Sequence, residues 1–347
     1  MRGFCEGFNG GVLAEPGVKL AVLEQQARDR DLELRLFPST IAMASLGGFI
    51  AGGSCGIGSI NHGVLRDRGN VRSLRVITAT EVPQVVDLRG AEIDKALHAY
   101  GTNGIITAID LPLTRRTDWQ PLTAAFESLE QAHRCAWAIG RSEGIHKRMI
   151  TLLEQPLVGF QKPVLEHLAP HAHALLLLVD PTDLSETITL IEEHQGHMVS
   201  KLATNLSEAT WNHTTLWVLK ADRDYTYLQC GFSPNPDQSW HQMSALKARF
   251  GDDWLIHSEW VRFMGAVQCW SLPVLRYRDR DYLEAMFAAC AELGVGISNP
   301  HTYILEEGGH DAGNPVQLAF KQFADPRGIL NPGKMKQFRR PDQYPSG

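Results

Sequence analysis

A run of glycines constrains this chain more than any other feature. Seven glycines fall within the seventeen residues from Gly47 to Gly63, inside the stretch PSTIAMASLGGFIAGGSCGIGSINHG. Each glycine gives up side-chain packing and loses more backbone entropy on folding than other residues, so such a run persists where bare backbone is needed. Two explanations fit: turns packed closely against a sheet, or backbone lying flat against a large ligand.

The two common phosphate-binding loops do not explain this run. A Walker loop requires a lysine directly after its last glycine, and none follows here. A dinucleotide fingerprint requires the spacing GxGxxG at the start of a helix, whereas the order here is GSCGIG with no helix predicted after it. Both motifs are therefore excluded.

Composition narrows the class of protein. The 347 residues, 44% of them hydrophobic and 21% charged, are typical of a soluble globular chain with two domains. A net charge of −6 argues against a general nucleic-acid surface. The sequence predicts no transmembrane segment and no secretory signal, which favours a cytoplasmic protein. The six cysteines contain no CxxC pair and are expected to be reduced thiols.

Hydrophobic periodicity predicts an α+β fold in which a strand-rich first part precedes a part of alternating strands and helices. The predicted helices are 19–34, 92–100, 121–142, 181–195, 280–294 and 314–324. The predicted strands are 10–18, 70–80, 82–90, 104–113, 173–180, 214–222, 225–232 and 267–277.

Three motifs in order carry a resemblance to a known family. They are the glycine-rich segment 11–80, AYGTNGIITAIDLPL at 99–113 and FADPRGILNPGKM at 323–335. Together they resemble the PCMH-type FAD-binding domain of the vanillyl-alcohol oxidase / p-cresol methylhydroxylase superfamily, nearest the D-lactate dehydrogenase / glycolate oxidase-like FAD-linked oxidases. The resemblance implies a partial FAD-binding domain (1–114), a substrate-cap domain with an antiparallel sheet (115–310) and a C-terminal segment (311–347) that returns to the flavin.

The resemblance also implies which residues hold FAD. Glycine amides would meet the diphosphate, and the second and third motifs would flank the ring. The implied cofactor-binding residues are Pro38, Thr40, Gly47, Gly48, Gly52, Gly53, Gly56, Ser59, His62, Gly63, Gly104, Ile105, Ile106, Asn331 and Lys334.

The chain departs from the family pattern in two places. Family members carry a further lobe with an RGxGT-type phosphate loop before the first motif, so we expect that lobe to be encoded upstream, supplied by a separate chain or lost. The family's HxxGDGNxH-like metal motif has no counterpart, and Pro300 replaces the glutamate of its SxEHG motif. The sequence therefore predicts no metal, although His257, His301, His310, Glu306 and Glu307 form a conceivable zinc set.

The expected activity is FAD-dependent oxidation of a small hydroxylated substrate, a hydroxy acid or an alcohol, with the electron acceptor unknown. His301 is the first candidate for the base, and His213, on a predicted strand face with two tryptophans, is the second. Arg276, Trp217 and Trp270 are candidates for substrate binding, each with ordinary packing or surface exposure as the alternative. The competing interpretation of the whole chain is a non-catalytic remnant, or a subunit that binds FAD only with its missing lobe.

Overall fold

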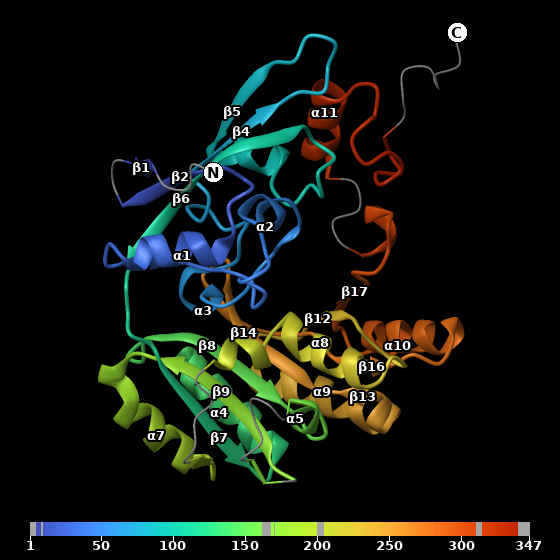
Figure 1. Cartoon of the computed structure of the whole chain (residues 1–347). Helices are drawn as coiled ribbons and strands as arrows, with labels where there is room; N and C mark the ends of the chain where they lie inside the picture. Colours follow the sequence, from blue (N-terminus) through green and yellow to red (C-terminus); the bar gives the residue numbers. More distant parts are fainter. Residues whose placement is uncertain are drawn as a thin grey trace. The chain divides into compact units, whose positions relative to one another are not determined.

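The computed structural model describes residues 5–7, 10–161, 168–169, 171–199, 205–309 and 314–338, and the chain divides into two compact units (Figure 1). The first unit comprises Met1–Cys55, Val64–Arg116 and Asn299–Gly347. The second unit comprises Gly56–Gly63 and Thr117–Ser298.

The first unit is built on an antiparallel sheet whose central strand is β6 (Ile105–Arg115). The strand order is β1 (Cys5–Gly7), β2 (Gly11–Ala14), β6, β4 (Ser73–Ile77) and β5 (Val85–Arg89), and β3 (Leu32–Leu34) pairs with the far end of β6. The helical segments are α1 (Leu20–Arg28), α2 (Leu46–Gly52), η1 (Gly90–Lys95), η5 (Leu305–Glu307) and α11 (Pro315–Ala324). Residues from both ends of the chain therefore share one unit.

The second unit has an eight-stranded antiparallel sheet. Its order is β10 (His197–Met198), β7 (Gln120–Phe126), β9 (His173–Val179), β8 (Lys147–Leu153), β14 (His257–Phe263), β15 (Ala266–Ser271), β12 (Gln229–Gly231) and β17 (Gly296–Ser298). A small sheet adds β11 (Tyr225–Tyr227), β16 (Val274–Arg276) and β13 (Trp254–Leu255). The helical segments are α3 (Ser59–His62), α4 (Leu129–Arg141), α5 (Leu157–Phe160), η2 (Pro181–Asp183), α7 (Leu184–Glu193), η3 (Leu206–Ala209), α8 (Asn212–Ala221), α9 (Pro236–Phe250), η4 (Gly251–Asp253) and α10 (Arg280–Glu292).

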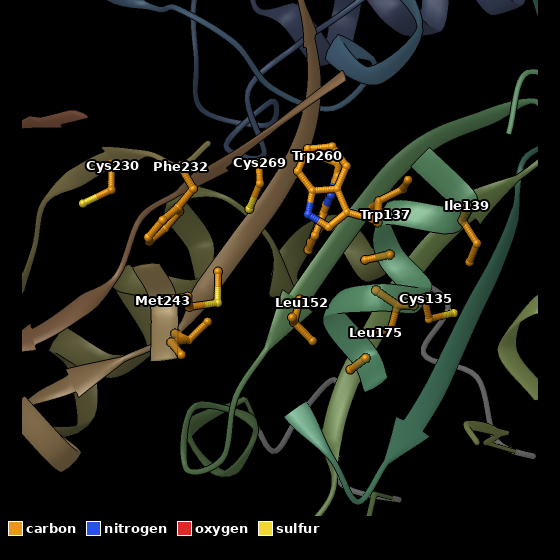
Figure 2. Packing of buried hydrophobic residues seen from close by; sticks show 14 of the residues in the cluster. Cys135, Trp137, Ile139, Leu152, Leu175, Cys230, Phe232, Met243, Trp260 and Cys269 are labelled. Carbon is orange, nitrogen blue, oxygen red and sulfur yellow. The ribbon is translucent and has the colours of Figure 1, made fainter. Parts of the chain in front are cut away.

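The core of the second unit lies between this sheet and its helices. Figure 2 shows Trp137 of α4 beside Trp260 of β14, with Met243 of α9 and Cys269 of β15 in the same cluster. The two indole rings meet edge to face with centroids 6.1 Å apart, an arrangement that aromatic pairs favour. Together with the two antiparallel sheets, this core confirms the predicted α+β class.

The end of the glycine run belongs to the second unit. Strands β8 and β14 pair only over three residues each, and α3 contacts both strands. The N–H of Gly58 donates to the carbonyl of Arg148 at 2.9 Å, and Ile60 is buried in the core cluster. The segment from Gly56 to Gly63 is thus held against the eight-stranded sheet of the second unit.

Three predicted elements were wrong. Residues 212–221 form helix α8 instead of a strand, so the alternating face of Trp211, His213 and Trp217 does not exist. β-Branched residues favour strands in isolation, but burial of Thr214 and Val218 on one helical face overrides that preference here. The segment 121–142 is strand β7 followed by α4, because Ser128 caps a new helix, and α1 ends at Arg28.

His133 on α4 makes the stability of the second unit depend on pH. Its imidazole is fully buried, which lowers its pKa to about 4, and its Nε2 accepts the indole N–H of Trp137 at 3.1 Å. The unfolded chain takes up this proton near pH 6.5 and the folded chain only near pH 4. We therefore expect the free energy of unfolding to fall by up to about 3 kcal/mol as pH drops across that window.

Urea denaturation at several pH values measures this fall. His133→Gln keeps an acceptor for Trp137 without a titrating proton, so its profile should be flatter than that of the wild type. His241, an exposed residue of α9, gives the control substitution His241→Gln, which should leave the slope unchanged. Identical slopes for wild type and His133→Gln would contradict the assignment.

Candidate functional site

Helix α2 presents a face without side chains. Ser45 caps the helix by accepting the N–H of Gly48, and Phe49 and Ile50 are buried against the first unit's core. Gly48 and Gly52, one turn apart, are exposed and lie on the same face of the helix. The sequence therefore builds an amphipathic helix whose outer face is bare backbone.

The amides of these glycines are already used within the chain. Gly47 donates to the carbonyl of Pro16 at 2.8 Å, Gly48 to Ser45 Oγ at 3.2 Å and Gly53 to the carbonyl of Phe49 at 2.7 Å. Each of these donors therefore has an acceptor within the chain, and contact of these N–H groups with a diphosphate stays a prediction. Because these glycines carry no side chain, a ligand can still approach their backbone closely.

Packing inside the chain explains the glycine run at two positions, and a third position is compatible with the ligand explanation. A Cβ on Gly53 would lie 2.2 Å from the ring of Phe49, and one on Gly47 would lie 2.5 Å from Cβ of Pro16, so packing inside the chain requires these two glycines. A Cβ on Gly52 would meet nothing closer than the ring of Tyr100, at 3.7 Å. The chain's own packing does not demand glycine there, which is what a surface kept bare for a planar ligand predicts.

The loop after η1 holds the end of α2 and was missed by the sequence analysis. His98 and Tyr100 have φ values of 52° and 51°, and their N–H groups donate to the carbonyls of Ile50 and Ala51. Nδ1 of His98 donates to the carbonyl of Gly53 at 2.7 Å, which leaves Nε2 to accept the Tyr100 hydroxyl at 3.0 Å. Non-glycine residues with positive φ cost free energy and cluster at functional sites. The only sequence signal was the Tyr-Gly pair that opens the second motif.

The C-terminal motif forms a turn around a buried ion pair. Lys321 Nζ lies 2.5 Å from the Asp325 carboxylate, and both side chains are almost fully buried. Lys321 also donates to the carbonyls of Thr102 and Leu330. Asp325 accepts the backbone N–H of Leu330 at 2.8 Å. The pair therefore joins α11, the second motif and the turn in one network.

Asn331 and Lys334 project from this turn. Asn331 has a φ of 43°, and its side-chain amide donates to the carbonyl of Tyr100 at 2.6 Å. Lys334 lies over the rings of Tyr100 and Tyr303. A pocket of about 320 Å³ adjoins the turn, and its lining includes Thr102, Lys321, Gly328, Asn331, Met335 and Phe338. The first unit thus brings the α2 end, the 98–104 loop and the 325–335 turn together.

The other predicted cofactor residues lie in two places. In the first unit, Pro38 and Thr40 are half-buried before α2, and Gly104 begins the segment that continues into β6. Gly104 has a φ of 85° and packs against Val76. The first two residues of β6 follow it, and Ile105 is 52% exposed. In the second unit lie Gly56, Ser59, His62 and Gly63, where Ser59 Oγ accepts the N–H of Gly56 at 3.0 Å.

The two predicted catalytic histidines belong to different units. His301 is exposed in the first unit, and its backbone N–H donates to Asn299 Oδ1 at 2.9 Å. His213 lies in the first turn of α8 in the second unit, where burial lowers its pKa. Trp217, one turn further on, donates its indole N–H to the carbonyl of Glu208.

Arg276 lies among acidic groups of the second unit. Its guanidinium is 3.3 Å from Asp222, 3.5 Å from Asp224 and 3.7 Å from Asp253, and it stacks on Tyr225. These carboxylates already balance its charge and repel a further one, so the geometry gives no support to a carboxylate clamp. Trp270 packs on the ring of Phe263, with centroids 5.5 Å apart, and bonds Gln268.

The conceivable zinc set is not assembled in the described part of the chain. His257 is fully buried and lies 2.8 Å from Glu259, whose carboxylate also accepts the hydroxyls of Thr151 and Thr210 and the N–H of Trp211. No group of three or more His, Cys, Asp or Glu side chains among the described residues is arranged to hold a metal ion. His310 lies outside the described residues. The His257–Glu259 network instead anchors the start of α8.

Comparison with known proteins agrees with this geometry. Residues 6–84 match the family described as FAD binding domain. Two crystal forms of alkyldihydroxyacetonephosphate synthase superpose with TM-scores of 0.65 and 0.67 at 15% identity, covering 93% and 95% of this chain. The chain spans 64% and 65% of those proteins' lengths. No match was found among curated proteins. No helix in the described ranges is long and apolar enough to cross a bilayer.

Residues 6–84 match an FAD-binding domain, and the fold of the chain is similar to that of alkyldihydroxyacetonephosphate synthase. The match over residues 6–84 agrees with the resemblance carried by the first motif, and FAD is the cofactor that the matched domain indicates. The exposed glycine face of α2 lies within the matched residues. The residues present therefore fit close approach by a flat ligand such as FAD, although four of the expected amide donors, those of Gly47, Gly48, Gly53 and Gly56, have acceptors within the chain.

The buried ion pair of the C-terminal turn gives a stability prediction. Lys321→Met should destabilise the first unit by about 3–5 kcal/mol, because it leaves the carboxylate of Asp325 buried without its partner. Lys336→Met is the matched control, since Lys336 pairs with Glu307 at the surface and should contribute about 0–1 kcal/mol. Chemical denaturation of both variants measures the difference, and equal midpoints would refute a structural role for the pair.

Proposed function

We propose that this chain is an FAD-dependent oxidoreductase that oxidises a small hydroxylated substrate, a hydroxy acid or an alcohol. FAD, when bound, supplies the hydride acceptor at flavin N5. The observation that carries the proposal is the exposed backbone at Gly52, within the residues that match an FAD-binding domain. The name of the similar structures denotes the making of a phosphate ester, so a small phosphate ester stands beside a hydroxy acid as a substrate class.

The chain contributes to FAD binding through a surface that a flat ligand can approach, more than through groups that neutralise the charge of the phosphates. The N–H groups of Gly47, Gly48 and Gly53 have protein acceptors, and Lys321 is paired with Asp325. A diphosphate needs donors or cations, each charge-assisted bond contributing about 1.5–3 kcal/mol. We therefore propose that a further segment, upstream or on a partner chain, supplies the remaining phosphate contacts.

Proton removal from the substrate hydroxyl is assigned to a histidine. Imidazole titrates near physiological pH and is the usual general base for such a step. His301 is exposed on the first unit, the unit that carries the bare face of α2. His213 is the second candidate, because burial lowers its pKa and so favours the unprotonated form.

Substitution of Gly52 tests the flavin face. Gly52→Leu should weaken FAD binding at least tenfold, because its side chain would occupy the space that a planar ligand needs, while the chain's own packing leaves that space open. Gly144→Leu is the matched control, since a Cβ there also meets nothing within 4 Å. Flavin fluorescence during titration measures both affinities.

The outcome of this titration also separates an enzyme that binds FAD by itself from a subunit that binds FAD only together with a further lobe. Equal affinities for wild type and Gly52→Leu would remove the α2 face from the site. Absence of binding by the wild-type chain, restored by adding the missing lobe, would favour a subunit that depends on a partner. Nanomolar binding by the chain alone would contradict the proposed need for further phosphate contacts.

The catalytic base is tested by flavin reduction in single turnover. If His301 is the base, His301→Ala should slow reduction by substrate about a hundredfold or more while FAD remains bound. His213→Ala is the parallel variant, and it should leave the rate nearly unchanged. A normal rate in His301→Ala with a slow rate in His213→Ala would transfer the role to His213.

A further inference from the structure

Lys334 carries a charge that no neighbouring carboxylate balances. Its Nζ lies 4.6 Å from the ring centroid of Tyr303 and 5.2 Å from that of Tyr100. An ammonium has three N–H donors, and here one is used, in a 3.1 Å bond to the carbonyl of Tyr303. Among the residues that the structure describes, no Asp or Glu lies within 4.0 Å of this ammonium.

Two acidic residues on η5, whose Leu305 N–H donates to the carbonyl of Lys334, are held by other donors. Glu306 accepts the backbone N–H groups of Lys336 and Gln337 at 2.9 and 3.1 Å. Glu307 pairs with Lys336 Nζ at 3.0 Å. Aromatic faces attract a cation without neutralising it, so Lys334 retains its full charge and two donors for a ligand.

The surroundings of Lys334 are fixed in place. The Tyr100 hydroxyl bonds His98, and the carbonyl of Tyr100 accepts the amide of Asn331. The hydroxyl of Tyr303 donates to the carbonyl of Pro332 at 3.1 Å. The ammonium is therefore positioned by two anchored rings, which reduces the entropy that a ligand must overcome on binding.

The same tyrosine connects this cation to the bare face of α2. The ring of Tyr100 has Lys334 over it and is also the nearest group to a Cβ on Gly52. Both contacts lie within the first unit. An anionic group of a ligand lying along the glycine face thus has one unbalanced cation within the same constellation.

We propose that Lys334, held between Tyr100 and Tyr303, is an oxyanion-binding residue that receives a carboxylate or phosphate group of a ligand. Lysine binds such groups as a point charge with charge-assisted hydrogen bonds. The proposal rests on the proposed function for the position of the ligand along α2. Recognition of the oxyanion itself requires no flavin and is tested without it.

The experiment titrates the full chain, free of flavin, with inorganic phosphate and separately with lactate at constant ionic strength. Tyrosine-ring NMR signals report binding. We expect a saturable shift of the Tyr100 and Tyr303 signals with a Kd of about 1 mM for at least one anion. The tighter anion identifies the group as phosphate or carboxylate. Lys334→Met should raise this Kd at least tenfold, whereas Lys334→Arg should retain it within about threefold.

Lys336→Met is the matched control, two residues away and ion-paired to Glu307, and should change the Kd less than about twofold. In the wild type, shifts of the Tyr225 or Tyr282 signals of the second unit in place of Tyr100 and Tyr303 would overturn the assignment. This wild-type measurement tests the proposal even if Lys334→Met does not fold. Absence of a saturable shift, or unchanged affinity in a folded Lys334→Met, would also overturn it. If the wild-type chain binds the oxyanion but not FAD, the proposed flavin function is refuted and the oxyanion proposal is not.

Discussion

The ion pair between Lys321 and Asp325 is the contact on which the candidate site depends, because it ties the end of α11 to two other segments. The ammonium reaches the carbonyls of Thr102 and Leu330, while the carboxylate closes the turn that follows α11. A buried pair is tolerated only when its remaining donors and acceptors are satisfied, and here they are shared among three parts of the chain. The turn that presents Asn331 and Lys334 is consequently fixed to the loop that contains Tyr100.

That loop in turn determines the geometry of α2. His98 and Tyr100 adopt left-handed backbone conformations, and their hydrogen bonds hold the carbonyls of Ile50, Ala51 and Gly53. These hydrogen bonds compensate the cost of the left-handed conformations. They also hold the C-terminal end of α2, next to the exposed glycines, in one position. A glycine run would be a flexible surface without this support. With it, the backbone at the end of α2 is held by hydrogen bonds from His98 and Tyr100.

The glycine run is divided between the two units, and its two halves have different structural roles. Gly47 and Gly53 allow tight packing inside the first unit, whereas Gly56 and Gly58 lead into α3, which contacts β8 and β14 of the second unit. In that second unit the buried carboxylate of Glu259 collects donors from two strands and from the start of α8. Polar networks in both units therefore fix segments that hydrophobic packing alone would leave less defined.

The sequence by itself pointed to an FAD-binding domain, because the glycine-rich segment and two later motifs resemble a known family and lie in short, continuous stretches of chain. It also predicted most strands of the first unit, where alternation is clear. Only the tertiary structure decided the helix at 212–221 and the break at Ser128, because burial against the sheet outweighs local propensity. It also decided which glycine amides are already bonded and that His98, Tyr100 and Lys334 meet. The contact of Lys334 with the ring of Tyr100, like the hydrogen bond from Asn331 to Tyr100, joins residues more than two hundred positions apart, and no periodicity along the chain encodes such a pairing.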